Sequence, residues 1–427
     1  MNEGPRRASE PASTPDLVEH YFRHEYGRIV ALLVRRVGIS HLELIEDAAQ
    51  GSLLAALTAW VKSGVPDDPR AWLYRAAHNR VLEVIRNDRR RQDILGVAAN
   101  EDRSDDEPAV SSFAGEVRDE LLRMLFVCCD DAIPRDSRLV LALKTLCGFS
   151  AGEIAFRLFT TEANVYKRLA RARERLREIG VDTQTPPLES LRSRLPSVHA
   201  VLYLLFNEGY LSTHAEHAIR AELCEEAIRL ATLLASHAVG EAPPTFALLA
   251  LMHFHAARLA ARQDATGGLL LLEEQDRSAW DAEHLQRGSM WLARAAEGDV
   301  FSRFHAEAGI AAEHCFAPSF AETRWNEIAD LYAMLQRIDP SPIHALNRAV
   351  AVAENRGPRA GLATLAGVVP PAWLDGHYMW DAVLADLHHR AGNKAQADSH
   401  RELALSAAPT EAVRQLLQRR LTKTREA

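Results

Sequence analysis

The sequence predicts an all-α protein. Apolar residues recur at three- and four-residue spacings along nearly the whole chain, which is the period of an amphipathic helix. The alternating apolar and polar runs that indicate half-buried strands are almost absent. Segments containing Gly and Pro separate the helical stretches. The length of 427 residues allows about three domains.

The composition is that of an ordinary globular protein. A net charge of −8, with 47% hydrophobic and 25% charged residues, excludes a disordered chain, a collagen-like fibre and a disulfide-dense miniprotein. The five cysteines are odd in number and follow no metal-ligand spacing, so we expect a reducing cytosol and no metal site. No apolar run reaches the roughly 18 residues of a membrane span, and the N-terminus lacks an apolar signal core. These features favour a cytoplasmic protein without a membrane partner.

A first helical domain is predicted over residues 14–95, after a disordered N-terminus at 1–13. Its three helices are expected at about 16–37, 42–62 and 70–91, with a Gly- and Pro-containing loop before the last. Apolar residues predict the buried stripes of the second and third helices. These residues are Ile45, Ala49, Leu53, Ala56 and Trp60, then Leu73, Ala77, Val81 and Val84.

An acidic linker is predicted over residues 96–113. Positions 101–107 hold five acids and one Arg, and no apolar period is present. The alternative is that this segment is only a solvated tether.

A second helical domain is predicted over residues 114–180, and it ends in a helix-turn-helix. Ser150 and Glu153 form a capping-box pattern at the start of one helix, and Thr161 can cap the next. The second helix has a buried stripe at Val165, Leu169, Ala172 and Leu176. Six basic and three acidic residues lie between positions 160 and 178.

The exposed face of this second helix fits the major groove of DNA. Residues in the first turns of such a helix reach base edges: Glu accepts from cytosine, Asn pairs with adenine and Arg pairs with guanine. Residues further along contact phosphates. The predicted DNA-binding residues are Thr161, Glu162, Asn164, Lys167, Arg168, Arg171 and Arg175. The alternative is a surface helix whose mixed charges only solvate it.

A second basic helix supports nucleic-acid binding. Residues 70–91 hold seven Arg against two acids, and Trp72 and Tyr74 lie near its start. Basic groups beside aromatic rings are typical of single-strand binding, where Arg follows phosphates and flat surfaces hold unstacked bases. The alternative is that Trp72 belongs to the core and the Arg cluster is a solvated helix end.

Three segments in order resemble bacterial RNA polymerase sigma factors of the extracytoplasmic-function type. They are IEDAAQGSLLAALTAW, PRAWLYRAAHNRVLEVIR and SAGEIAFRLFTTEANVYKRLARARERLR. The first two resemble sigma region 2, the last resembles region 4, and the resemblance covers about residues 15–180. It implies a transcription initiation factor that binds core RNA polymerase and promoter DNA, without catalytic chemistry or a cofactor.

The resemblance also implies roles for individual residues. Glu46, Asp47 and Gln50 match the polymerase-binding face. The loop at 63–69 matches the reader of the minus-ten element, and so do Arg75, His78, Asn79, Arg80 and Arg86. The helix at 161–177 matches the minus-thirty-five reader, and the acidic linker would thread toward the RNA exit path. This sequence departs from the family in the turn Leu158-Phe-Thr-Thr161, where the usual Leu-Gly-Val-Ser-like turn has Gly.

Residues 186–427 are predicted to form a tetratricopeptide-like helical extension. Gly392, Ala397, Ala404 and Pro409 fit that repeat signature. Stacked helix pairs form a concave surface, so a regulatory protein or ligand is a possible partner here. Seven polar or aromatic residues stand out, and they either fasten the domain internally or line a groove. They are Asn207, Glu208, Tyr210, Gln275, Asp276, Arg277 and Trp280.

The sequence also bears on two other classes of function, an enzyme and a regulator that does not bind polymerase. An enzyme is disfavoured because no His-Glu-x-x-His pattern, Gly-rich phosphate loop or G-x-S-x-G elbow occurs. His214 and His217 are the histidine pair whose spacing permits a chelate. A helix-turn-helix regulator or scaffold with a tetratricopeptide adaptor, not associated with polymerase, would explain the second helix but not the Arg-rich third helix of the first domain.

Overall fold

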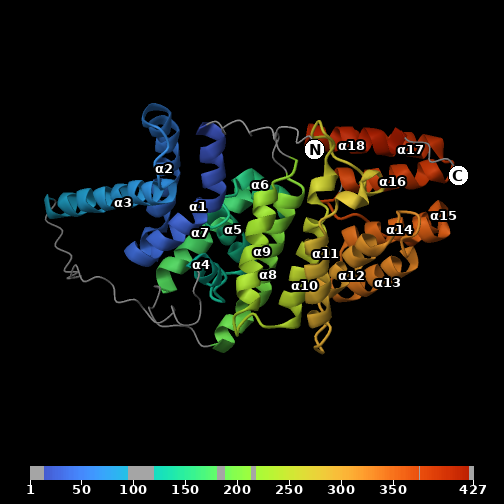
Figure 1. Ribbon diagram of the computed structural model, residues 1–427, viewed down its shortest axis with the longest axis horizontal. Helices are drawn as coiled ribbons and strands as arrows, with labels where there is room; N and C mark the ends of the chain where they lie inside the picture. Colours follow the sequence, from blue (N-terminus) through green and yellow to red (C-terminus); the bar gives the residue numbers. More distant parts are fainter. Residues whose placement is uncertain (1–13, 95–119, 180–187, 213–217, 375, 423–427) are drawn as a thin grey trace, which may run out of the picture. The chain divides into compact units, whose positions relative to one another are not determined.

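A computed structural model describes residues 14–94, 120–179, 188–212, 218–374 and 376–422 (Figure 1). The predicted disordered N-terminus and the acidic linker lie outside these residues, as do His214 and His217. Within them the fold is helical, and the extended structure is limited to one isolated bridge between Gln263 and Leu269. The all-α prediction is confirmed.

The chain divides into two compact units, which are described separately. The first contains residues 1–150 and 166–190, and the second contains 151–165 and 191–427. In this division the first helix and the turn of the helix-turn-helix belong to the second unit together with the C-terminal extension. The predicted domain bounds stay a prediction.

The first unit is built on three long helices, α1 (Thr14–Val37), α2 (Leu42–Ser63) and α3 (Pro69–Ile94), with α1 packing against both others. The predicted stripe of α2 is buried from Ile45 to Trp60. On α3, Leu73, Ala77 and Val81 are buried, but Val84 is only half-buried because the helix continues beyond the core into its Arg-rich end. Edge-to-face packing of Trp60 on Trp72, at 5.7 Å, joins α2 to the start of α3.

The first unit also holds α4 (Glu120–Cys128), α5 (Arg135–Thr145) and most of α7 (Glu162–Ile179). Helix α1 contacts α4, and it passes close to the end of α5. A Cβ at Gly27 would lie 2.1 Å from the carbonyl oxygen of Leu146, so glycine is required at this crossing. The stripe Val165, Leu169, Ala172 and Leu176 of α7 is buried as predicted.

The second unit starts with α6 (Ala151–Arg157) and continues with helices of the extension. These are α8 (Leu188–Tyr210), α9 (Ala221–Ala235), α10 (Pro243–Ala256), α11 (Ala282–Ala295), α12 (Arg303–Phe316), α13 (Trp325–Ile338), α14 (Pro342–Arg356), α15 (Pro358–Thr364), α16 (Tyr378–Arg390), α17 (Lys394–Ser406) and α18 (Glu411–Thr422). Helix α10 is apolar all round and packs against α9, α11 and α12, as expected of a helix at the centre of a domain.

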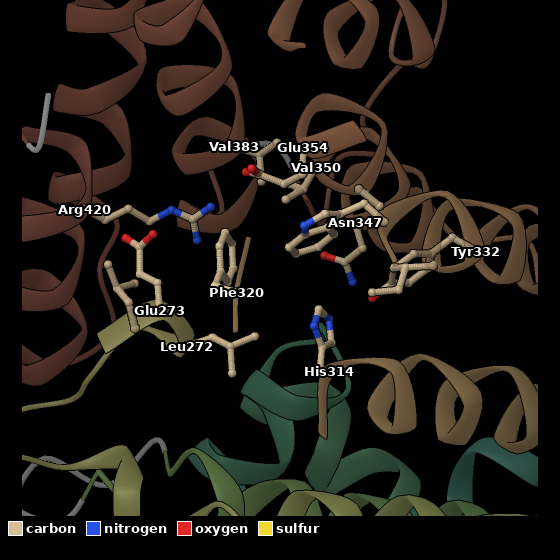
Figure 2. A pocket seen from close by; sticks show the side chains of 14 residues that line it. Leu272, Glu273, His314, Phe320, Tyr332, Asn347, Val350, Glu354, Val383 and Arg420 are labelled. Carbon is tan, nitrogen blue, oxygen red and sulfur yellow. The ribbon is translucent and has the colours of Figure 1, made fainter. Parts of the chain in front are cut away.

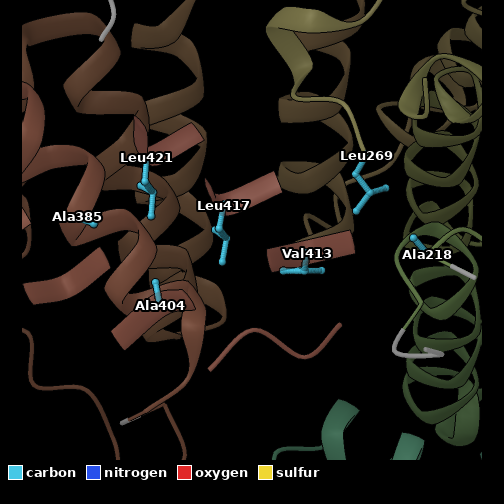
Figure 3. Packing of buried hydrophobic residues seen from close by; sticks show 7 residues of the cluster. All are labelled: Ala218, Leu269, Ala385, Ala404, Val413, Leu417 and Leu421. Atoms are coloured by element: carbon cyan, nitrogen blue, oxygen red, sulfur yellow. The ribbon is translucent and has the colours of Figure 1, made fainter. Parts of the chain in front are cut away.

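The C-terminal helices form pairs. Helices α13 and α14 pack together, as do α16 and α17, where Gly392 adopts a positive φ in the turn and Ala397 and Ala404 are buried. Figure 3 shows Ala404 in one apolar cluster with Leu417 of α18 and Leu269 of the loop between α10 and α11. The helix pairs agree with the predicted ones, whereas their tetratricopeptide nature stays a prediction.

Candidate nucleic-acid interface

Helix α3 presents the predicted minus-ten residues on its outer side. Arg75, Asn79, Arg80 and Arg86 are exposed, and His78 is half-buried. The helix starts at a cap in which Asp68 accepts a hydrogen bond from the backbone N–H of Ala71, at 3.0 Å. Because Arg75, Arg80 and Arg86 are exposed, this face of α3 is cationic and open to solvent.

Aromatic groups at the start of α3 divide between core and surface. Trp72 packs on Trp60, so its main role is structural. Tyr74 instead stacks on His78, with 5.9 Å between ring centroids and nearly parallel planes. Burial, followed by the charges of Arg36 and Arg86, lowers the pKa of His78. A neutral imidazole beside a phenol ring is a flat surface of the kind on which a base can stack.

Helix α7 presents the predicted minus-thirty-five residues. Six of the seven are exposed, namely Thr161, Glu162, Asn164, Lys167, Arg171 and Arg175. The seventh, Arg168, is half-buried, and its guanidinium lies 3.4 Å from the carboxylate of Asp136 on α5. The Thr161 hydroxyl accepts from the backbone N–H of Asn164 at 3.3 Å, which confirms the predicted cap.

The turn before α7 is strained at Phe159. This residue has a φ of +48°, a conformation that L residues with a side chain rarely adopt. It stands where the family pattern places Gly, which adopts this φ without a steric penalty. Its ring packs on two rings of the extension, Trp373 at 4.4 Å and His377 at 5.6 Å.

Helix α6 is fixed to the extension by buried charges. Arg157 donates to the carboxylate of Glu208 at 2.8 Å and to the backbone carbonyls of Asn207 and Leu211. Glu208 is completely buried, and Arg220 bridges it to Glu153 of α6, at 3.5 and 3.2 Å. Two of the residues singled out in the sequence, Asn207 and Glu208, therefore hold the helix-turn-helix.

Comparison with known families agrees with this geometry. A model described as Sigma-70 region 2 matches residues 21–91, and one described as Sigma-70, region 4 matches residues 123–176. The chain belongs to the sigma-70 family of sigma factors, and it is of the extracytoplasmic-function type with a C-terminal extension. A sigma factor of this kind binds core RNA polymerase and recognises the minus-ten and minus-thirty-five elements of promoter DNA.

The extension has a match of its own. Residues 194–296 match a family of unknown function, DUF6596. An uncharacterised protein of Rhizobium meliloti (strain 1021) is 34% identical over 378 residues, which cover 87% of this chain and 88% of the relative. The similarity thus extends through the sigma regions and the extension together. No solved structure matches the chain.

Membrane spans and metal-ion sites are absent from the described residues. No helix among the described residues is long and apolar enough to cross a membrane. The described parts of the chain also contain no group of three or more His, Cys, Asp or Glu side chains placed to hold a metal ion.

The predicted polymerase-binding residues of the sigma factor differ in exposure. Asp47 is exposed and Gln50 is half-buried, but Glu46 is only 4% exposed. Glu46 accepts from the Thr145 hydroxyl at 2.6 Å and forms an ion pair with Arg173 of α7. Arg173 also reaches Glu43 at 3.1 Å. The docking role of the three residues stays a prediction, and in this arrangement Glu46 joins region 2 to the reading helix.

Arg157, Phe159 and Arg173 are not among the site residues predicted from the sequence. The replacement of Gly by Phe159 was visible as a departure from the family turn, but its partners lie more than 200 residues away. Arg157 and Arg173 resemble the other arginines of the helix-turn-helix. Only burial distinguishes them, because their side chains are 15% and 18% exposed.

Replacing Arg173 with Ala should destabilise the first unit by about 3–5 kcal/mol, because it leaves Glu46 as a buried charge without its partner. Burial already raises the pKa of Glu46, and Arg173 opposes that rise. When the pKa of a carboxyl is higher in the folded state than in the unfolded state, the free energy of unfolding falls as the pH rises above the unfolded-state pKa. The loss in the variant should therefore be larger at about pH 8 than at about pH 5.

Hydrogen exchange of α2 peptides at the two pH values measures this effect. Arg177→Ala, which removes an exposed arginine from the same helix, is the control. Equal α2 protection in Arg173→Ala and wild type at both pH values would contradict a stabilising pair.

Proposed function

We propose that this sigma factor contacts core polymerase through the exposed side of α2 around Asp47 and Gln50. The family assigns that side to docking. Asp47 carries an exposed carboxylate, which a basic partner surface can pair. The factor acts without catalytic chemistry, metal or cofactor, in the cytoplasm where its polymerase is found.

Promoter reading is divided between the two cationic helices. The observation that carries this proposal is the exposure of polar side chains on the first turns of α7, above a fully buried apolar stripe. Glu162, Asn164, Lys167 and Arg168 read base edges, while Arg171 and Arg175 bind phosphates. On α3, an unstacked base is captured near Asn79, with Arg75, Arg80 and Arg86 along the strand and His78 beside it. Base capture and phosphate contacts offset the few kcal/mol that unstacking costs.

We further propose that the extension supports region 4. Arg157 contacts Asn207, Glu208 and Leu211 of the extension, and the strained turn at Phe159 packs on Trp373 and His377. The helix-turn-helix of this chain thus has part of its core outside region 4, which assigns the extension a function in transcription.

Reversing the charge of Asp47 with Asp47→Arg should abolish binding to core polymerase while the fold is kept, because the exposed carboxylate would become repulsive to a basic partner. Co-purification with core enzyme and run-off transcription measure it. Glu297→Arg, an exposed charge reversal on the extension, is the matched control. Run-off transcription at the wild-type level from Asp47→Arg would exclude this docking face.

Arg168→Ala should reduce discrimination at one position of the minus-thirty-five element by about 1–3 kcal/mol, with polymerase binding unchanged. Arg171→Ala should instead weaken all promoters alike and reduce the salt dependence by about one counterion. Competition among promoters carrying single substitutions, at several salt concentrations, separates the two effects. If both variants lose affinity uniformly, the division into base and phosphate contacts is wrong.

Trp373→Ala should lower minus-thirty-five-dependent transcription, because the φ of +48° at Phe159 loses its packing partner. A cost of about 1–2 kcal/mol corresponds to roughly a 5- to 30-fold effect. Adding Phe159→Gly should restore most of the activity, since Gly holds this φ without support. Val369→Ala, an exposed site in the same loop, is the control. Absence of rescue by Gly would contradict the supporting role.

A further inference from the structure

The extension contains a cavity between α10, α12, α13 and α14. It consists of two hollows of about 250 and 310 Å³, both of which are lined by His314, Tyr332 and Asn347. Figure 2 shows these three side chains pointing into the space from different helices. The shared lining makes the two hollows neighbours around one polar centre, and their size is that of a small-molecule site.

Apolar and aromatic side chains form part of the wall of each hollow. Phe320, Trp325 and Ile328 line one hollow, and Leu251, Ile310 and Leu335 line the other. A flat organic molecule would replace water along such walls.

Two histidines that line the cavity each have a buried ring nitrogen without a hydrogen-bond partner among the described residues. The Nδ1 atoms of His255 and His314 are buried, and neither has a partner among the described residues. Burial, followed in each case by the charge of Arg258, lowers the pKa of both rings to about 3, so both are neutral. Buried polar atoms are nearly always satisfied, and both rings line the hollow of about 310 Å³.

Behind the histidines lie three arginines that have no carboxylate partner among the described residues: Arg258, Arg262 and Arg277. Arg258 donates to the side-chain carbonyl of Gln275 at 3.2 Å, and Arg262 donates to the backbone carbonyl of Tyr210. Arg277 donates to the carbonyl of His314 at 2.8 Å. Arg258 and Arg262 are 8% and 9% exposed.

The acids that line the cavity are already paired or lie near an opposite charge. Glu307 binds Arg303 at 2.7 Å, and Glu354 binds Arg390 at 2.7 Å. At the far end, Glu273 and Arg420 line the same hollow (Figure 2). Buried charges are normally paired, so the buried guanidinium groups of Arg258 and Arg262 leave an excess of positive charge near the histidines, to which the half-buried Arg277 adds.

We propose that this cavity binds a small organic anion with a flat apolar body, its anionic group beside His255 and His314 and its body along Tyr332 and the apolar walls. The anion compensates the charge of the three arginines and satisfies the histidine nitrogens. Several of the residues singled out in the sequence of the extension then share one role, which is to position these arginines. Tyr210, Gln275 and Trp280 hold the arginines in place, since Arg262 stacks on Tyr210 at 3.6 Å and Arg277 on Trp280 at 4.5 Å.

Three probes of one size and different charge test the proposal on the full-length protein: benzoate, benzamide and benzylamine. Saturation-transfer NMR reports binding at millimolar concentrations, and the unfolding temperature reports stabilisation by a bound probe. Benzoate should bind and stabilise, benzamide should bind about tenfold more weakly, and benzylamine should show no transfer. No transfer from benzoate, or binding of benzylamine equal to that of benzoate, would overturn the proposal.

Variants locate the site. Arg258→Gln should weaken benzoate about tenfold and leave benzamide unchanged, because only the charge of the site is altered. Filling the cavity with Ala311→Phe, or with the smaller Ala351→Leu if the first does not fold, should abolish binding of both probes. His389→Phe on α16, outside the lining, is the control for loss of a histidine. Wild-type benzoate binding in a folded, filled variant would overturn the assignment.

Discussion

The ion pair between Arg157 and Glu208 is the contact on which the organisation of the second unit depends. Both side chains are largely or fully buried, and breaking such a pair costs about 3–5 kcal/mol. The pair joins the first helix of a DNA-reading motif to the end of α8. It therefore fixes that helix to the extension, and the next turn has contacts there too, because Phe159 packs on Trp373 and His377 while it keeps a backbone conformation that its side chain disfavours.

The end of α8 has a second set of contacts. Backbone carbonyls of residues 207 and 211 accept from Arg157, and that of Tyr210 accepts from Arg262. One turn of helix thus contacts both the helix-turn-helix and the arginines behind the cavity. A small shift of this turn would move both sets of contacts, because close-packed interiors have low compressibility.

Charged side chains in the core regions of this protein have two kinds of partner, carboxylates in one group and neutral carbonyl oxygens in the other. In the first unit, Glu46 has Arg173 and Thr145 as partners. In the second unit, Arg157, Arg303 and Arg390 each have a glutamate, whereas Arg258, Arg262 and Arg277 have carbonyl oxygens and aromatic faces. The second group therefore keeps part of its positive charge without compensation, because carbonyl dipoles only partly offset a buried charge.

The sequence by itself determined the helical class, the stripes of α2 and α7, the Thr161 cap and the helix pairs of the extension, because periodicity and capping act over a few residues. It also singled out residues such as Glu208, Tyr210 and Trp280, without their partners. Tertiary structure alone decided that Glu46 is buried, that Phe159 packs on Trp373, and that His255 and His314 border one cavity. Contacts between residues about 60 to more than 200 positions apart depend on how helices pack, and helical periodicity carries no information about which faces meet.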